Sequence, residues 1–262
     1  MLDFNKIVKK MLKKWWKILF KDDIFEILDP ERKTEYQNRI DKFIYKLRSN
    51  WIIINLKAWV YLIPDSEDLK LNKVDLIEKY YIKLLKKYII HYVWNSYYIS
   101  WTKSLEIHNK NYSIPDKIFI VNRCINKKIK FQNFEIIFKT IFWKKDNKKL
   151  NLYNKFSNFT TIKDIDGIDF KVSNLELSLL ESAIISDNIN WFDISLLNKT
   201  IKKYWNVLNI DIFYDIWKYK YIMSFNRLKE LSKNINKDLY LVFLDIIKKN
   251  GWLFIWEGLR GI

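Results

Sequence analysis

The sequence predicts an α+β fold: an N-terminal winged helix-turn-helix, followed by a mixed α+β body with a helical C-terminal part. Three observations support this order of elements. A basic helix pattern over 31–49 is followed by two short apolar runs that flank a tight turn. Apolar runs of strand length then recur between 117 and 172, and from 194 onward apolar residues return at every third or fourth position.

The winged helix-turn-helix is expected over residues 1–64. Apolar residues at helical spacing predict a first helix over 4–14, and Asp22 is expected to cap a short helix that ends at Leu28. A longer helix is predicted over 31–49, because its apolar side chains lie three or four residues apart and so share one face. These side chains are Tyr36, Ile40, Phe43, Ile44 and Leu47.

A β-hairpin is predicted directly after the basic helix. Residues 52–56 and 60–63 are apolar runs of strand length, and a short turn separates them. A basic helix followed by two strands with a tight turn is the pattern of a winged helix-turn-helix.

An α+β body is expected over 73–250, with a loosely held tail over 251–262. The link over 65–72 is polar, but it lacks the glycine and serine of a flexible tether. Within the body we expect helices over 74–90 and 100–108, strands over 117–121, 134–141 and 168–172, a helix capped by Asn174, and four helices near 194–204, 209–218, 224–233 and 238–248.

The charge favours a polyanionic partner. The chain carries a formal net charge of +17, and residues 1–63 hold 14 Lys and Arg against 8 Asp and Glu, a net of +6 by subtraction. Such an excess attracts DNA or RNA. The alternative is an AT-rich gene, which raises the lysine content without any functional reason.

The helix over 31–49 is the predicted DNA-reading element. Lys33, Gln37 and Asn38 are expected to contact bases, because the first residues of such a helix reach base edges. The alternative is an ordinary solvated helix face, and a second basic stretch over 123–155 could be a solvated loop. The predicted DNA-binding set is Arg32, Lys33, Gln37, Asn38, Arg39, Lys42, Lys46 and Lys57, with Arg39, Lys42 and Lys57 assigned to phosphates.

The sequence contains no convincing catalytic set, and we expect no enzymatic activity, cofactor or metal. Nucleotide-binding loops, nucleophile elbows and paired-histidine metal motifs are missing from the sequence. Asp164 and Asp166 could hold magnesium, but a turn into the next strand is the preferred reading. His91 and His108 are expected to be structural, and Cys124, the one cysteine, is expected to be a buried thiol in a cytoplasmic protein.

Membrane insertion is not expected, because the longest apolar runs are of strand length.

Glycine is scarce and tryptophan is abundant. The chain has 4 glycines and 12 tryptophans, whereas an average chain of this length has roughly 18 glycines. Trp51 follows a predicted helix end, Trp59 lies in the predicted hairpin turn, and Trp191 follows an asparagine, all places that favour glycine. One hypothesis is that the source reads UGA as glycine whereas the printed sequence reads it as tryptophan. The alternative is that these indoles fill cores and interfaces.

Several segments, in order, resemble the AbiEi-type family of antitoxins and transcriptional regulators. The segment 45–64 resembles that family's helix end, wing and exit strand, except that Trp51 and Trp59 stand where the family has glycine. The segment 98–109 resembles the family's "YisG.sAL..hG" helix. The apolar strand 118–121 before Arg123 and the helix over 172–181 also follow the family pattern.

This resemblance implies a winged-helix regulator that binds double-stranded DNA and represses its own operon. It further implies an antitoxin of a type IV, or abortive-infection, system, with a nucleotidyltransferase-like toxin as protein partner. We also expect binding to DNA either as a homodimer or at repeated sites. Two rival classes are a structural RNA-binding protein, such as a divergent ribosomal component, and an enzyme on an unfamiliar α+β fold.

Overall fold

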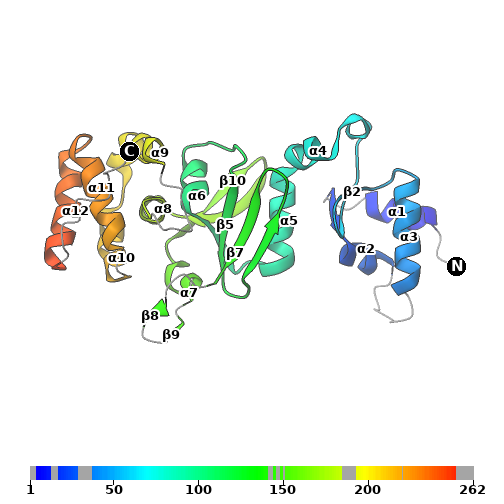
Figure 1. Ribbon diagram of the computed structural model, residues 1–262, viewed down its shortest axis with the longest axis horizontal. Helices are drawn as coiled ribbons and strands as arrows, with labels where there is room; N and C mark the ends of the chain where they lie inside the picture. The colour runs from blue at the N-terminus through cyan, green and yellow to red at the C-terminus, as the bar shows by residue number, and fades with distance from the viewer. Residues whose placement is uncertain are drawn as a thin grey trace. The chain divides into compact units, whose positions relative to one another are not determined.

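The computed structural model describes residues 4–12, 17–28, 37–140, 144–145, 148–149, 151–184, 193–219 and 221–251. It is a mixed α+β structure (Figure 1). Its chain divides into two compact units, residues 1–92 and 93–262. In the described part of the chain, no helix has the length and apolar character needed to cross a membrane.

The first unit combines three short strands with helices. The strands are β1 (Ile18–Phe20), β2 (Ile54–Lys57) and β3 (Val60–Leu62), and β3 lies between the other two in an antiparallel sheet. The helices are α1 (Phe4–Leu12), α2 (Lys21–Leu28), α3 (Gln37–Ser49), α4 (Lys73–Lys79) and α5 (Tyr81–Val93), with a short 3-10 helix η2 (Asp68–Lys70) before α4.

The predicted hairpin and the buried face of the basic helix are confirmed. Ile40, Ile44 and Leu47 of α3 are buried in one cluster with Leu19 of β1 and Tyr61 of β3. The three helix residues are three or four apart, so α3 turns one apolar stripe toward this core. The predicted start of this helix, over 31–36, and its Tyr36 lie outside the described residues.

Two details of the first unit differ from the sequence prediction. The helix α2 begins at Lys21, and the carboxylate of Asp23, not Asp22, accepts a hydrogen bond from the backbone N–H of Phe20 at 2.6 Å. The single helix expected over 74–90 is divided at Tyr80, whose hydroxyl donates to the buried Asp68 at 2.7 Å.

The segment after β3 is ordered by Asp68. Burial alone would raise the pKa of this carboxyl, but hydrogen bonds from Lys79 at 2.6 Å and from Tyr80 outweigh it and lower the pKa. Asn72 then caps α4, because its side chain accepts the backbone N–H groups of Val74 and Asp75. The helices α4 and α5, except for Val93 at the end of α5, group with the first unit, whereas the sequence analysis placed the beginning of the body at residue 73.

The described strands of the second unit include a six-stranded mixed sheet in the order β10-β11-β4-β5-β7-β6. The pairs β4–β11 and β5–β7 are parallel, and the other neighbouring pairs are antiparallel. The three predicted strands are present with small changes in their ends. The strands are β4 (Tyr97–Ser100), β5 (Lys117–Asn122), β6 (Lys127–Lys130), β7 (Glu135–Lys139), β10 (Thr160–Ile165) and β11 (Ile168–Ser173).

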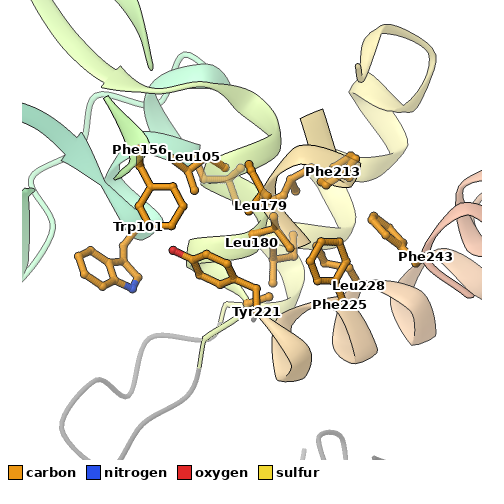
Figure 2. Close-up of a cluster of buried hydrophobic side chains, with 14 of the residues drawn as sticks. Trp101, Leu105, Phe156, Leu179, Leu180, Phe213, Tyr221, Phe225, Leu228 and Phe243 are labelled. Atoms are coloured by element: carbon orange, nitrogen blue, oxygen red, sulfur yellow. The ribbon is translucent and has the colours of Figure 1, made fainter. Parts of the chain in front are cut away.

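A helical C-terminal part follows the sheet, as the sequence predicts. Phe213, Phe225 and Phe243, from three of its helices, pack edge to face in its core (Figure 2). Of the predicted tail over 251–262, Gly251 is described, and residues 252–262 lie outside the described residues. The helices of the second unit are α6 (Trp101–His108), α7 (Leu152–Phe156), α8 (Leu175–Ser182), α9 (Ile194–Tyr204), α10 (Ile210–Ile216), α11 (Ile222–Lys233) and α12 (Lys237–Lys249), with 3-10 turns η3 (Trp205–Val207) and η4 (Trp217–Tyr219).

The carboxylates at Asp164 and Asp166 belong to a hairpin turn, the preferred of the two readings. Ile165 pairs with Ile168, so Asp166 and Gly167 form the turn between β10 and β11, with φ of 54° and 74°. The Asp164 carboxylate accepts the backbone N–H of Gly167 at 3.2 Å. Among the described residues, no group of three His, Cys, Asp or Glu side chains could hold a metal ion.

Candidate nucleic-acid interface

The exposed side of α3 is basic and carries one aromatic ring. Lys42 and Lys46 are both exposed, one helical turn apart, on the side opposite the buried Ile40, Ile44 and Leu47. The same amphipathic pattern that buries the apolar stripe therefore presents two ammonium groups to solvent. Two of the predicted phosphate or base contacts are thus placed on one accessible helix face.

The other predicted residues of this helix are placed only by the backbone. Gln37, Asn38 and Arg39 form the first turn of α3. Asn38 and Lys42 are four residues apart and so share a face of the helix. The predicted contacts Arg32 and Lys33 lie outside the described residues.

Lys57 stands apart from these residues, at the end of β2 in the hairpin. It pairs with Val60 of β3, after an irregularity in register between Asn55 and Lys57. The hairpin turn that follows it consists of Ala58 and Trp59, both exposed. Lys57 therefore lies next to the hairpin tip, and the Lys57 side chain is half-buried.

The positive charge of α3 is opposed by one acid within the helix. The segment Gln37–Ser49 contains four Lys or Arg residues and a single acid, Asp41. The Asp41 carboxylate forms an ion pair with Lys21 of α2, with an N–O distance of 2.6 Å. Because that ion pair lies near the surface, it contributes little to stability. Lys21 nevertheless neutralises the Asp41 carboxylate, which is the one negative charge beside Lys42.

Tyr45 is a candidate contact that the sequence reasoning missed. Its side chain is 71% exposed, the largest exposed fraction among the exposed large hydrophobic side chains that the structure describes. Tyr45 lies three residues after Lys42 and one before Lys46, so it shares their side of α3. The sequence did contain a signal for its exposure. Tyr45 lies between Ile44 and Leu47 but does not follow the three-to-four residue spacing of the buried side chains.

The second basic stretch forms the edge of the large sheet. Lys127, Lys128 and Lys130 of β6 are exposed. Glu135 of the neighbouring strand forms ion pairs with Lys128 at 2.6 Å and with Lys130 at 3.8 Å. Lys128 and Lys130 therefore have an acidic partner on the neighbouring strand. The short strands β8 (Lys144–Lys145) and β9 (Lys148–Lys149) pair with each other in an antiparallel arrangement.

A buried polar network in the second unit joins β4, α6, β11 and α8. The Ser104, Ser173 and Ser178 hydroxyls lie within 2.8–3.0 Å of one another. His108 Nε2 lies 2.8 Å from the carbonyl oxygen of Ser173, and burial lowers the pKa of His108 to about 4. His108 is therefore neutral at physiological pH and ties two elements together, a structural use of the ring.

Glu181 lies in the same region and is 3% exposed. It accepts hydrogen bonds from the Tyr98 hydroxyl at 3.3 Å and from the backbone N–H of Trp101 at 3.4 Å. Burial raises the pKa of Glu181 to about 7 despite these hydrogen bonds. This carboxyl is buried, so its titration makes the free energy of unfolding depend on pH.

Cys124 corrects one sequence expectation. It is exposed, not buried, because it lies in the loop between β5 and β6. Its backbone N–H donates to the Asn122 side chain at 2.9 Å, which fixes the loop while leaving the thiol outside.

No protein-family model and no curated protein matches this chain.

Proposed function

We propose that this chain is a sequence-specific DNA-binding transcriptional regulator in which residues 1–64 are a winged helix-turn-helix. One observation carries the proposal. The helix α3 buries Ile40, Ile44 and Leu47 in the core and leaves Lys42 and Lys46 exposed together. A rigid helix with a basic outer face is suited to the major groove, which is wide enough to admit an α-helix.

The order of elements supports the same assignment. The described part of residues 1–64 runs α1, β1, α2, α3, β2, β3, with β1 paired to β3 and β2 on the other side of β3. A winged helix-turn-helix has a reading helix that is followed directly by a hairpin. Here that helix is α3, and the hairpin is the β2–β3 wing with Lys57 near its tip.

The contacts follow from the chemistry of the side chains. Lys42, Lys57 and Arg39 neutralise phosphates and release counterions, which positions the protein without reading sequence. Gln37 and Asn38 begin α3, where amide side chains can pair with the N6 and N7 atoms of adenine. Arg32 and Lys33 complete the proposed reading surface, and Lys46 adds a second lysine of α3 for phosphate contact.

We propose autoregulation as the biological role. The resemblance to AbiEi-type proteins favours an antitoxin that represses its own operon, binds DNA as a homodimer, and opposes a nucleotidyltransferase-like toxin through its body. Co-expression with the product of the adjacent gene tests the antitoxin role. Relief of growth arrest by this chain supports it, and arrest that persists at equal expression overturns it.

A gel mobility shift with the DNA upstream of its own gene tests the DNA-binding role. The matched pair of variants is Lys42→Ala/Lys46→Ala on α3 and Lys70→Ala/Lys73→Ala on η2 and α4, which remove the same charge from exposed positions. We expect only the first variant to lose the shift. Equal losses in both variants, or a preference for bulk RNA, would reject the assignment in favour of nonspecific charge or of a structural RNA-binding protein.

A further inference from the structure

Four tryptophans have a backbone conformation that favours glycine. The φ angles of Trp51, Trp59, Trp94 and Trp101 are 56°, 63°, 51° and 56°. Residues with a Cβ rarely adopt positive φ, because the Cβ atom then crowds the following carbonyl oxygen, and for a bulky residue it is an outlier.

The concentration of positive φ on tryptophan is specific. The structure describes six tryptophans, and these four are the majority of them. The other two, Trp205 and Trp217, have ordinary helical φ of −52° and −54°. Among the remaining described residues other than glycine, only Lys110 and Asp166 have positive φ, and aspartate is enriched there.

Trp51 occupies a helix-capping position typical of glycine. Its N–H donates to the carbonyl of Arg48 at 3.0 Å, and the N–H of Ile52 donates to the carbonyl of Leu47 at 3.0 Å. These two hydrogen bonds define a Schellman motif, whose left-handed residue is usually glycine. Here that residue is Trp51, which is 68% exposed and so gains little from burial of its ring.

Trp59 occupies the hairpin turn between β2 and β3. Tight hairpin turns contain residues with positive φ, and glycine is the residue most often found there. The side chain of Trp59 is 68% exposed, so packing gives no reason for an indole at this position.

Trp94 and Trp101 flank β4. Trp94 directly follows α5 and is 67% exposed. Trp101 begins α6 and is 5% exposed, and Figure 2 shows its ring at the edge of the buried cluster. The centroid of this ring lies 4.6 Å from that of Phe119. At three of the four positions, the indole is therefore mostly in solvent while its backbone is strained.

We infer that the natural chain carries glycine at the positions of Trp51, Trp59, Trp94 and Trp101, because its source reads the codon UGA as glycine. This single difference in codon reading then explains both the low number of glycines, 4, and the high number of tryptophans, 12. Both glycines that the structure describes, Gly167 and Gly251, also have positive φ. The inference is independent of the proposed function, and it removes three exposed indoles from the surface of the natural protein.

Mass spectrometry of the protein isolated from its natural source is the decisive test. Cleavage after lysine and arginine places the four positions in the peptides 49–57, 58–70 and 88–103. We expect each peptide to be lighter by the mass difference between tryptophan and glycine, once in the first two and twice in the third. Peptides with the full mass of tryptophan at these positions, or UGG codons in the gene, would overturn the inference.

A stability measurement tests the backbone argument without the natural source. The variant Trp51→Gly/Trp59→Gly/Trp94→Gly changes only the three exposed positions, since removal of the buried Trp101 ring would also remove packing. We expect the thermal midpoint to rise by roughly 1–4 °C for each substitution. Trp205→Gly is the control, because its φ is helical, and we expect its midpoint to fall. A fall of similar size in both variants contradicts the argument.

Discussion

Trp51 and Gly251 occupy the same position at the ends of two different helices. Trp51 follows Asn50 after α3, and Gly251 follows Asn250 after α12; their φ angles are 56° and 60°. Each N–H donates to the carbonyl three residues earlier at 3.0 Å. Each preceding asparagine also donates its side-chain N–H to the carbonyl four residues earlier, at 2.7 Å and 2.6 Å.

Trp51→Gly is expected to stabilise the fold by about 0.5–1 kcal/mol, because relief of the left-handed strain exceeds the extra entropy that glycine loses on folding. Chemical denaturation followed by circular dichroism measures this difference without relying on tryptophan fluorescence. Gly251→Ala is the reverse experiment: its Cβ meets nothing within 4 Å, so the strain alone should destabilise. Stabilisation by Gly251→Ala would contradict the capping argument.

Removal of Lys42 and Lys46 is expected to change the salt dependence of DNA binding. Each lysine at a phosphate contributes about one unit to the slope of log affinity against log salt, so Lys42→Ala/Lys46→Ala should reduce the slope by about 2. Fluorescence anisotropy with labelled duplex at several salt concentrations measures it. The slope of Lys70→Ala/Lys73→Ala should match that of the unaltered chain. An unchanged slope in the α3 variant would place its lysines away from DNA.

Tyr45→Ala separates function from stability. The ring is 71% exposed, so its loss should change the free energy of unfolding by less than about 0.5 kcal/mol. Its position between Lys42 and Lys46 predicts weaker DNA binding nevertheless. Tyr45→Phe retains the ring and tests whether the hydroxyl is the contacting group. If Tyr45→Ala binds the duplex as tightly as the unaltered chain, Tyr45 is outside the interface.

Glu181 and His108 predict opposite dependences of stability on pH. The pKa of Glu181 is about 7 in the folded chain and 4.5 as the ordinary value, so the folded state holds the extra proton and stability falls as pH rises through that range. The pKa of His108 is about 4, below its ordinary 6.5, so stability rises with pH between these values. The two effects offset each other between about pH 4.5 and 6.5.

The variant Glu181→Gln removes the contribution to stability that falls as pH rises. Its stability should therefore rise with pH between 4.5 and 6.5 more steeply than that of the unaltered chain, by up to about 1.4 kcal/mol per pH unit. Urea unfolding at a series of pH values measures both curves. Parallel curves for Glu181→Gln and the unaltered chain would show that Glu181 titrates normally.

Local periodicity was sufficient to predict part of the fold. The buried stripe of α3, the hairpin after it and the helices from Ile194 onward depend on spacing within one segment. Positive φ at Trp51 and Trp59 was also predictable, because helix ends commonly have a left-handed residue and tight hairpin turns favour one.

Long-range contacts explain what the sequence could not predict. The strand β4 exists because it pairs with β5 on one side and with β11, more than seventy residues later, on the other. The helix break at Tyr80 coincides with a hydrogen bond to Asp68, twelve residues earlier. The network around Ser173 and Glu181 likewise joins distant segments, so no local motif marks it.

Sequence-specific duplex binding tests the central claim most directly. The affinity of the full chain is measured at one salt concentration for three probes: the duplex upstream of its gene, a scrambled duplex of equal length, and RNA. The account predicts that the upstream duplex binds at least about 1,000-fold more tightly than the scrambled one. Equal affinity for all three probes would contradict it.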